Sequence, residues 1–159
     1  MDKTIVVQPE KCTGCHTCEL VCSFTHTEEF NPTRSRISVI NFEKIGFAFP
    51  VLCQQCGEAA CMKVCPVGAV SKNAVTGAME INDSKCLRCQ MCTIACPVGA
   101  TLYDPVANIV AKCDLCQGDP QCVKLCPSGA ISYQAASVSS LSKRKASAAR
   151  FTEVFEEVG

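Results

Sequence analysis

The stretch Cys86-Leu-Arg-Cys89-Gln-Met-Cys92-Thr-Ile-Ala-Cys96-Pro97 holds four cysteines at the spacing C-x2-C-x2-C-x3-C-P. Three similar groups accompany it, so all 16 cysteines of the 159-residue chain fall into four groups of four. In chain order, groups one to four are Cys12-Cys15-Cys18-Cys22, Cys53-Cys56-Cys61-Cys65, Cys86-Cys89-Cys92-Cys96 and Cys113-Cys116-Cys122-Cys126. This repetition decides the architecture.

Thiolates at this spacing suit a [4Fe-4S] cubane, which needs four soft anionic ligands at its corners. A C-x2-C-x2-C loop can wrap three sulfurs around one cube, whereas the closing cysteine cannot easily turn back to it. The spacing therefore predicts that groups work in pairs, each closing cysteine serving the partner's cube. Three groups close with Cys-Pro-x-Gly-Ala, while group one continues as Cys22-Ser-Phe-Thr and is the divergent copy.

Two other uses of many cysteines are weaker. A disulfide scaffold is typical of short secreted chains, but the start Met1-Asp-Lys-Thr-Ile lacks the apolar stretch of a signal peptide. Structural zinc also uses C-x2-C pairs, although zinc ribbons separate two such pairs by a longer loop. Zinc therefore stays an alternative of low probability.

The composition points to a chain that depends on its metal. There is no tryptophan and only 6% of residues are aromatic, so the conventional core is thin. Cluster binding should supply the missing folding free energy. Fifteen basic and fifteen acidic residues give no bias toward nucleic acid. Lysines precede three of the groups, namely Lys11, Lys85 and Lys112, and either raise the cluster potentials or only offset the cluster charge.

The segments between the groups are short and extended. Residues 69–83, 101–112 and the insertion 31–50 each predict a β-hairpin, and single strands are expected at 4–8 and 130–134. Phe42, Phe47 and Phe49 on the insertion are expected to pack around the clusters. His16 lies inside the first loop, but four cysteines are already available there, so we expect it not to be a ligand.

The motifs resemble those of bacterial two-cluster ferredoxins, in which a strand before the first motif pairs with one after the second. Groups two and three have the separation of such a unit, which leaves groups one and four for the other. The nested quartets are then Cys12, Cys15, Cys18 and Cys126; Cys113, Cys116, Cys122 and Cys22; Cys53, Cys56, Cys61 and Cys96; Cys86, Cys89, Cys92 and Cys65. A sequential pairing, one with two and three with four, is the alternative.

The predicted fold class is thus α+β, with two ferredoxin-like modules, short β-hairpins and a helical tail. Module A comprises 1–30 with 104–134, and module B is the insert 31–103. Residues 135–159 contain no cysteine and read as a serine-rich linker followed by an amphipathic helix, with Phe151, Val154, Phe155 and Val158 on one face. That helix is a candidate for self-association or for docking on a partner subunit.

Residues 3–134 resemble the four-cluster, polyferredoxin-like iron–sulfur subunits of molybdenum or tungsten pterin oxidoreductases. The stretch from Cys22 to Arg36 is most similar to the small electron-transfer subunit of tungsten-dependent aldehyde oxidoreductase complexes. The resemblance implies a pterin-containing catalytic subunit on one side and a flavin subunit or ferredoxin on the other. The membrane-linked members carry a C-terminal transmembrane anchor, and none is expected here. With no signal or span, a cytoplasmic location is expected.

These features predict an electron carrier and not a catalyst. No nucleophile and base pair, phosphate loop or open metal position is visible, and all sixteen cysteines are assigned as ligands. A dedicated subunit of an oxidoreductase is the first hypothesis, and a freely diffusing polyferredoxin serving several enzymes is the alternative.

Overall fold

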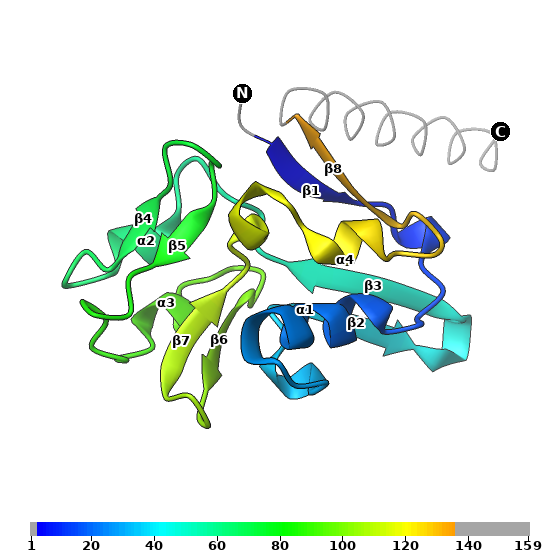
Figure 1. Cartoon of the computed structure of the whole chain (residues 1–159), viewed down its shortest axis with the longest axis horizontal. Helices are drawn as coiled ribbons and strands as arrows, with labels where there is room; N and C mark the ends of the chain where they lie inside the picture. The colour runs from blue at the N-terminus through cyan, green and yellow to red at the C-terminus, as the bar shows by residue number, and fades with distance from the viewer. Residues whose placement is uncertain (1–2, 136–159) are drawn as a thin grey trace, which may run out of the picture.

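The chain folds into four two-stranded antiparallel sheets joined by short helices (Figure 1). The computed structural model describes residues 3–135, and every count of elements or contacts refers to that part of the chain. The strands are β1 (Lys3–Val7), β2 (Ile37–Phe42), β3 (Phe47–Leu52), β4 (Val70–Lys72), β5 (Met79–Ile81), β6 (Thr101–Asp104), β7 (Ile109–Lys112) and β8 (Ile131–Ala135). The predicted tail helix lies outside the described residues.

The helices are short except for the first. They are α1 (Thr17–Thr27), α2 (Ala60–Lys63), α3 (Met91–Ile94) and α4 (Gln121–Lys124), with 3-10 turns η1 (Pro9–Lys11), η2 (Pro32–Arg34), η3 (Glu43–Ile45) and η4 (Leu115–Gly118). Strands and helices are thus mixed in short pieces, and the expectation of a small α+β fold with short hairpins is confirmed.

Three of the four sheets are local hairpins, as predicted: β2 with β3, β4 with β5, and β6 with β7. Side chains close two of these turns. Asn73 Oδ1 accepts the N–H groups of Val75 and Thr76 at 2.8 and 3.2 Å, and Asp104 Oδ1 accepts those of two residues in the β6–β7 turn. Such Asx turns fix the register of short strands.

The fourth sheet joins the two ends of the described chain. β1 pairs antiparallel with β8, and Ile5 lies opposite Tyr133. The strand before group one therefore meets the strand after group four, as in the ferredoxin unit that the sequence resembles. The packing of β1 against β8 brings groups one and four into one neighbourhood.

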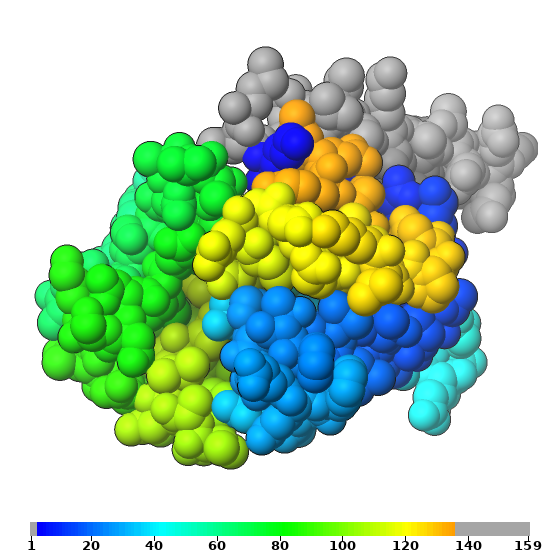
Figure 2. Space-filling view, viewed as in Figure 1, coloured from blue at the N-terminus to red at the C-terminus, as the bar shows by residue number. Residues whose placement is uncertain are grey.

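Two hydrophobic cores contain the cysteines. The first combines Ile5, Ile37, Leu52, Leu115 and Ile131 with cysteines of groups one and four. The second combines Val70, Met79 and Val110 with cysteines of groups two and three. Residues near 120, yellow in Figure 2, cross the visible face between helix α1 and the β1–β8 sheet. Cys113, which precedes them, borders both cores.

The β2–β3 hairpin lies against the first core, although the sequence placed it in the 31–103 insert. Ile37 and Leu52 on its inner face are almost fully buried. On its outer face, Phe42 and Phe49 are 48% and 39% exposed, and Phe47 lies between their rings at 6.1 and 6.4 Å. Strand alternation turns all three aromatics to the outer face, opposite buried Ala48, so the expectation that they pack around the clusters is wrong.

Helix α1 was not predicted and is the longest helix described. It begins after His16 and ends at Glu28, both in left-handed conformation, and it packs against α4. Cys18 and Cys22 lie four residues apart on its buried face. No helix among residues 3–135 is long and apolar enough to span a bilayer.

Candidate iron–sulfur cluster sites

Three enclosed cavities are each bordered by four cysteines. The first is bordered by Cys12, Cys15, Cys18 and Cys126, the second by Cys22, Cys113, Cys116 and Cys122, and the third by Cys65, Cys86, Cys89 and Cys92. The three cavities are similar in size. Every set takes three cysteines from one group and the closing cysteine of another.

The remaining four cysteines are Cys53, Cys56, Cys61 and Cys96. Cys53 and Cys61 are buried in the second core, whereas Cys56 is exposed. All sixteen cysteines are free in the structure, which disfavours the disulfide alternative.

The first turn of all four groups has the same backbone geometry. The residue immediately before the second cysteine has a positive φ in each group: Gly14 at +65°, Gln55 at +49°, Arg88 at +57° and Leu115 at +59°. For a residue with a Cβ this conformation costs about 1–2 kcal/mol. Three strained turns at equivalent positions indicate that the direction of the cysteine side chains is functionally constrained.

The repeated phrase Cys-Pro-x-Gly-Ala supplies hydrogen bonds to sulfur. Its glycines, Gly68, Gly99 and Gly129, have φ of +61° to +64°, which turns the next N–H back toward the cysteine. The N–H of Ala69 donates to Cys65 Sγ at 3.2 Å, and that of Ala100 donates to Cys96 Sγ at 3.3 Å. Such bonds favour the thiolate.

Group one lacks this phrase, and the insertion replaces it. The backbone N–H of Arg36 donates to Cys22 Sγ at 3.4 Å. Burial nevertheless raises the pKa of the Cys22 thiol. The divergent group thus obtains its sulfur hydrogen bond from a segment outside its own motif.

Burial strongly raises the pKa of cysteine thiols in and beside the first core, among them Cys122. It raises the pKa of Cys18 to about 12, with help from the Glu19 carboxylate, and raises the pKa of Cys113 to about 12. These thiols keep their protons unless a cation replaces them. Iron is such a cation, and soft sulfur donors around an apolar cavity of this kind fit a [4Fe-4S] cluster.

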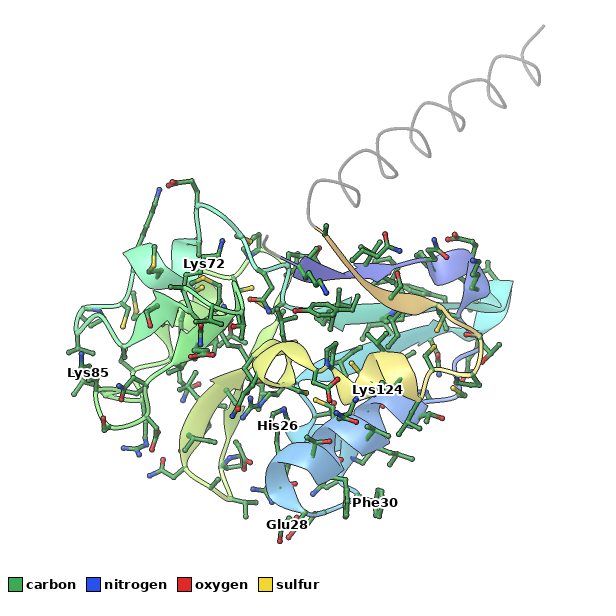
Figure 3. All side chains as sticks on the ribbon, turned by 45° about the horizontal axis from the view of Figure 1, so that its top comes forward. His26, Glu28, Phe30, Lys72, Lys85 and Lys124 are labelled. Carbon is green, nitrogen blue, oxygen red and sulfur yellow. The ribbon has the colours of Figure 1, made fainter. Side chains whose placement is uncertain are left out.

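A polar network that the motifs did not reveal borders the second cavity. His26 Nε2 lies 3.5 Å from Asp114 Oδ1 and 3.9 Å from Cys116 Sγ, and Arg36 Nη1 donates to Asp114 Oδ2 at 2.7 Å. Figure 3 shows His26 on α1 beside the fourth group. Burial and the Arg36 charge lower the pKa of His26. His26 and Cys116 both border the second cavity.

His16 borders the first cavity, but both of its ring nitrogens are paired with other side chains. Its Nδ1 lies 2.6 Å from Glu19 Oε2 and its Nε2 lies 2.9 Å from Asn41 Nδ2. Glu19 is buried and its other oxygen accepts the N–H of Val39 at 2.6 Å. His16 therefore ties the first loop to the β2–β3 hairpin.

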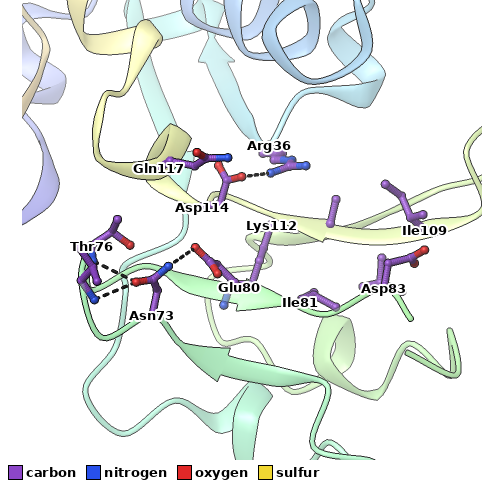
Figure 4. Close-up of a pocket in the computed structure, with 13 residues that line it drawn as sticks. Arg36, Asn73, Thr76, Glu80, Ile81, Asp83, Ile109, Lys112, Asp114 and Gln117 are labelled. Atoms are coloured by element: carbon purple, nitrogen blue, oxygen red, sulfur yellow. Dashed lines mark hydrogen bonds and ion pairs between the residues drawn. The ribbon is translucent and has the colours of Figure 1, made fainter. Parts of the chain in front are cut away.

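A wide hollow lies between the second and third cavities and shares Arg36 and Asp114 with the second (Figure 4). Its charged lining has both signs: Arg36 and Lys112 face the same space as Glu80, Asp83 and Asp114. No cysteine lines it. We therefore place the redox chemistry in the sulfur-lined cavities.

Comparison with known proteins identifies the cysteine groups. Residues 45–136, which hold groups two to four, match the family described as 4Fe-4S dicluster domain. The chain belongs to this 4Fe-4S dicluster family. Residues 9–25, around group one, match a second 4Fe-4S binding domain.

Relatives of this 4Fe-4S dicluster protein are subunits of oxidoreductases. It is 38% identical over 122 residues to the polyferredoxin-like subunit of aliphatic sulfonate oxidoreductase from Pyrococcus furiosus, covering 77% of the chain and 70% of the relative. It is 34% identical to formate hydrogenlyase subunit 2 of Escherichia coli K12, covering 91% and 88%. The match to the beta subunit of phenylglyoxylate dehydrogenase from Aromatoleum evansii, 37% identical, covers 82% of the chain but 30% of that subunit.

Among solved structures, it is similar to a chain of the active-site complex of benzoyl coenzyme A reductase. The TM-score is 0.50 and the identity 30%, covering 83% of this chain and 78% of the other. These findings place the dicluster protein among iron–sulfur electron-transfer subunits of oxidoreductase complexes, which are not catalytic by themselves.

Proposed function

We propose that the chain binds four [4Fe-4S] clusters and relays single electrons through them. A bound cluster supplies reversible one-electron chemistry, and the protein supplies thiolates, burial and hydrogen bonds. The proposed quartets are Cys12, Cys15, Cys18 and Cys126; Cys22, Cys113, Cys116 and Cys122; Cys53, Cys56, Cys61 and Cys96; Cys65, Cys86, Cys89 and Cys92.

The observation that carries this proposal is the mixed origin of the cavity walls. Cys126 is the fourth cysteine around the cavity of group one. Cys22 is the fourth cysteine around the cavity of group four. Cys65 is the fourth cysteine around the cavity of group three. The nested pairing of groups one with four and two with three requires these neighbours, whereas a sequential pairing would put Cys22 with group two. The β1–β8 sheet supports the same pairing.

As partners we propose a tungsten or molybdenum pterin catalytic subunit and, at the other end of the electron path, a flavin subunit or ferredoxin. The support is the resemblance of the Cys22–Arg36 stretch to the small subunit of tungsten-dependent aldehyde oxidoreductase complexes. The similarity to a chain in an active-site complex of a reductase points to the same kind of assembly.

Metal analysis tests the cofactor proposal. Anaerobically purified protein should contain about sixteen iron and sixteen sulfide ions per chain. Zinc in their place, or fewer than about twelve iron ions after reconstitution, contradicts four cubanes.

Purification from the native source tests the partner proposal. A dedicated subunit should remain with a pterin-containing polypeptide through several columns, and metal analysis of that complex should show tungsten or molybdenum. Recovery of the chain alone would favour the freely diffusing polyferredoxin.

A further inference from the structure

Lys112 is the one basic side chain that is buried within residues 3–135, with 5% of its surface exposed. It ends strand β7 and directly precedes group four. Lys11 and Lys85 hold the equivalent positions before groups one and three, and both are exposed. Figure 3 shows Lys85 at the outer edge of the molecule. The lysine that precedes a cysteine group is therefore buried at Lys112 and exposed at Lys11 and Lys85.

Lys112 points to a cysteine of a different group from the one it precedes. Its Nζ donates to Cys61 Sγ at 3.3 Å, and the sulfur of Cys53, in the same group, is near enough for its charge to act on the ammonium. Both cysteines belong to group two, whereas the neighbour of Lys112 in the chain is Cys113. The lysine therefore reaches from the backbone beside group four to the sulfurs of the Cys53–Cys56–Cys61–Cys96 site.

Within residues 3–135, the hydrogen bond of the Lys112 ammonium goes to sulfur. Among the described residues, none of the ion pairs to Asp or Glu involves Lys112. A buried ammonium is costly unless an anion compensates it. The anionic charge that compensates it here is that of thiolate sulfur, strengthened by a charge-assisted hydrogen bond.

The other quartets receive weaker hydrogen bonds. In two of them, backbone N–H groups donate to Cys22, Cys65 and Cys86. In the remaining one, Cys126 Sγ lies 3.7 Å from the Ser128 hydroxyl. A backbone N–H or a hydroxyl carries only part of a charge. A full positive charge in a buried environment acts more strongly on a neighbouring site. It stabilises the more negative, reduced state of that site relative to the oxidised state.

A second contact runs in the opposite direction and fixes this geometry. Gln55, in the first loop of group two, donates from Nε2 to the carbonyl of Cys113 at 2.9 Å. Its Oε1 accepts the N–H of Met79 at 2.7 Å. Gln55 and Lys112 thus cross between groups two and four, so Lys112 is held in place by packing on both sides.

We propose that Lys112 raises the reduction potential of the Cys53–Cys56–Cys61–Cys96 site. An electron passing through the chain then reduces this site preferentially. The inference rests on the proposed four-site function. The site gains one electron from a partner redox centre, its net charge falls by one, and Lys112 keeps its proton while no bond forms or breaks. Lys112 is a positioning residue that acts through Cys61 and Cys53.

Potentiometric titration of the full chain, followed by electron paramagnetic resonance, tests the proposal. In Lys112→Met and Lys112→Gln, one of four one-electron components should move to more negative potential while the other three stay in place. Lys112→Arg keeps the charge and should remain near wild type. Lys85→Met is the matched control for a lysine that precedes a cysteine group, and it should leave this component unmoved.

Assignment of the shifted component uses Cys56→Ala, which removes an exposed ligand of the same site. In that background Lys112→Gln should no longer change any remaining component. An unchanged set of four potentials in both neutral variants overturns the proposal, and so does an equal shift of all four. If Lys112→Met loses iron, the reduction potentials of Lys112→Gln and Lys112→Arg decide the test. Fewer than four components in the wild-type protein would instead overturn the four-site function.

Discussion

Replacing Gln55 should destabilise the holoprotein far more than replacing the adjacent Gln54. Gln55 is 9% exposed, and its amide joins group two to β5 and to group four through two hydrogen bonds. Gln54 is exposed and makes one 3.1 Å bond to Leu52 in its own segment. The two residues are chemically identical and differ only in what they contact.

The magnitude follows from the groups left without partners. Gln55→Leu keeps similar bulk but leaves the Met79 N–H and the Cys113 carbonyl unpaired in the interior. Each unsatisfied buried group costs about 1–3 kcal/mol, so we expect a loss of about 2–4 kcal/mol after relaxation. Gln54→Leu should cost less than about 1 kcal/mol.

Cluster loss in guanidinium chloride measures this difference as a rate. Unfolding of an iron–sulfur protein is irreversible once the clusters are released, so kinetic stability is the appropriate quantity. At about 1.4 kcal/mol per factor of ten, a loss of 2 kcal/mol makes the visible absorbance of Gln55→Leu decay about thirtyfold faster. Gln54→Leu should stay within about fivefold of wild type. Equal rates for the two variants would refute the bridging role.

Three further changes have defined outcomes. Gly14→Ala should speed cluster loss more than Gly99→Ala. Both glycines have positive φ, but a Cβ at Gly14 would also meet Asn41 Oδ1 at 3.0 Å, whereas a Cβ at Gly99 would meet open space. Equal rates of cluster loss would contradict this. Burial by itself raises the pKa of Asp104, but hydrogen bonds from Arg34 and from the backbone of its turn outweigh burial and hold that pKa below its usual range. The stabilisation that the ionised Asp104 gives the fold is therefore present above about pH 4 and is lost as the pH falls through the lowered pKa. The extra cluster-loss rate of Asp104→Asn over wild type should therefore shrink in acid, and a gap that widens below about pH 4 would contradict the ion pair's role. Removal of iron with a chelator under reducing conditions should abolish the native near-ultraviolet circular dichroism, since metal binding supplies much of the folding free energy; a fully retained spectrum would refute that.

Local features of the fold could be predicted from the sequence because local chemistry encodes them. The three hairpins and the terminal strands follow from turn residues and alternating patterns, and the cysteine groups follow from motif spacing. Helix α1 was missed because Cys18 and Cys22 were read as loop ligands, although their i, i+4 spacing suits one helix face.

The contacts that cross between groups could not be predicted in this way. Lys112 and Cys61 are 51 residues apart, and Gln55 and Cys113 are 58 apart. Nothing in either motif records which distant sulfur or carbonyl a side chain will meet. His26 was likewise visible only as a histidine outside the motifs, until folding placed it beside Asp114.

The central claim is that each closing cysteine completes the site of its partner group. A crystal structure of the anaerobically purified holoprotein, with iron located by anomalous scattering, tests it most directly. We expect four cubanes, with Cys22 bound to the cube of Cys113, Cys116 and Cys122, and Cys65 bound to that of Cys86, Cys89 and Cys92. Cys22 bound to the same cube as Cys12, or zinc at these positions, would contradict it.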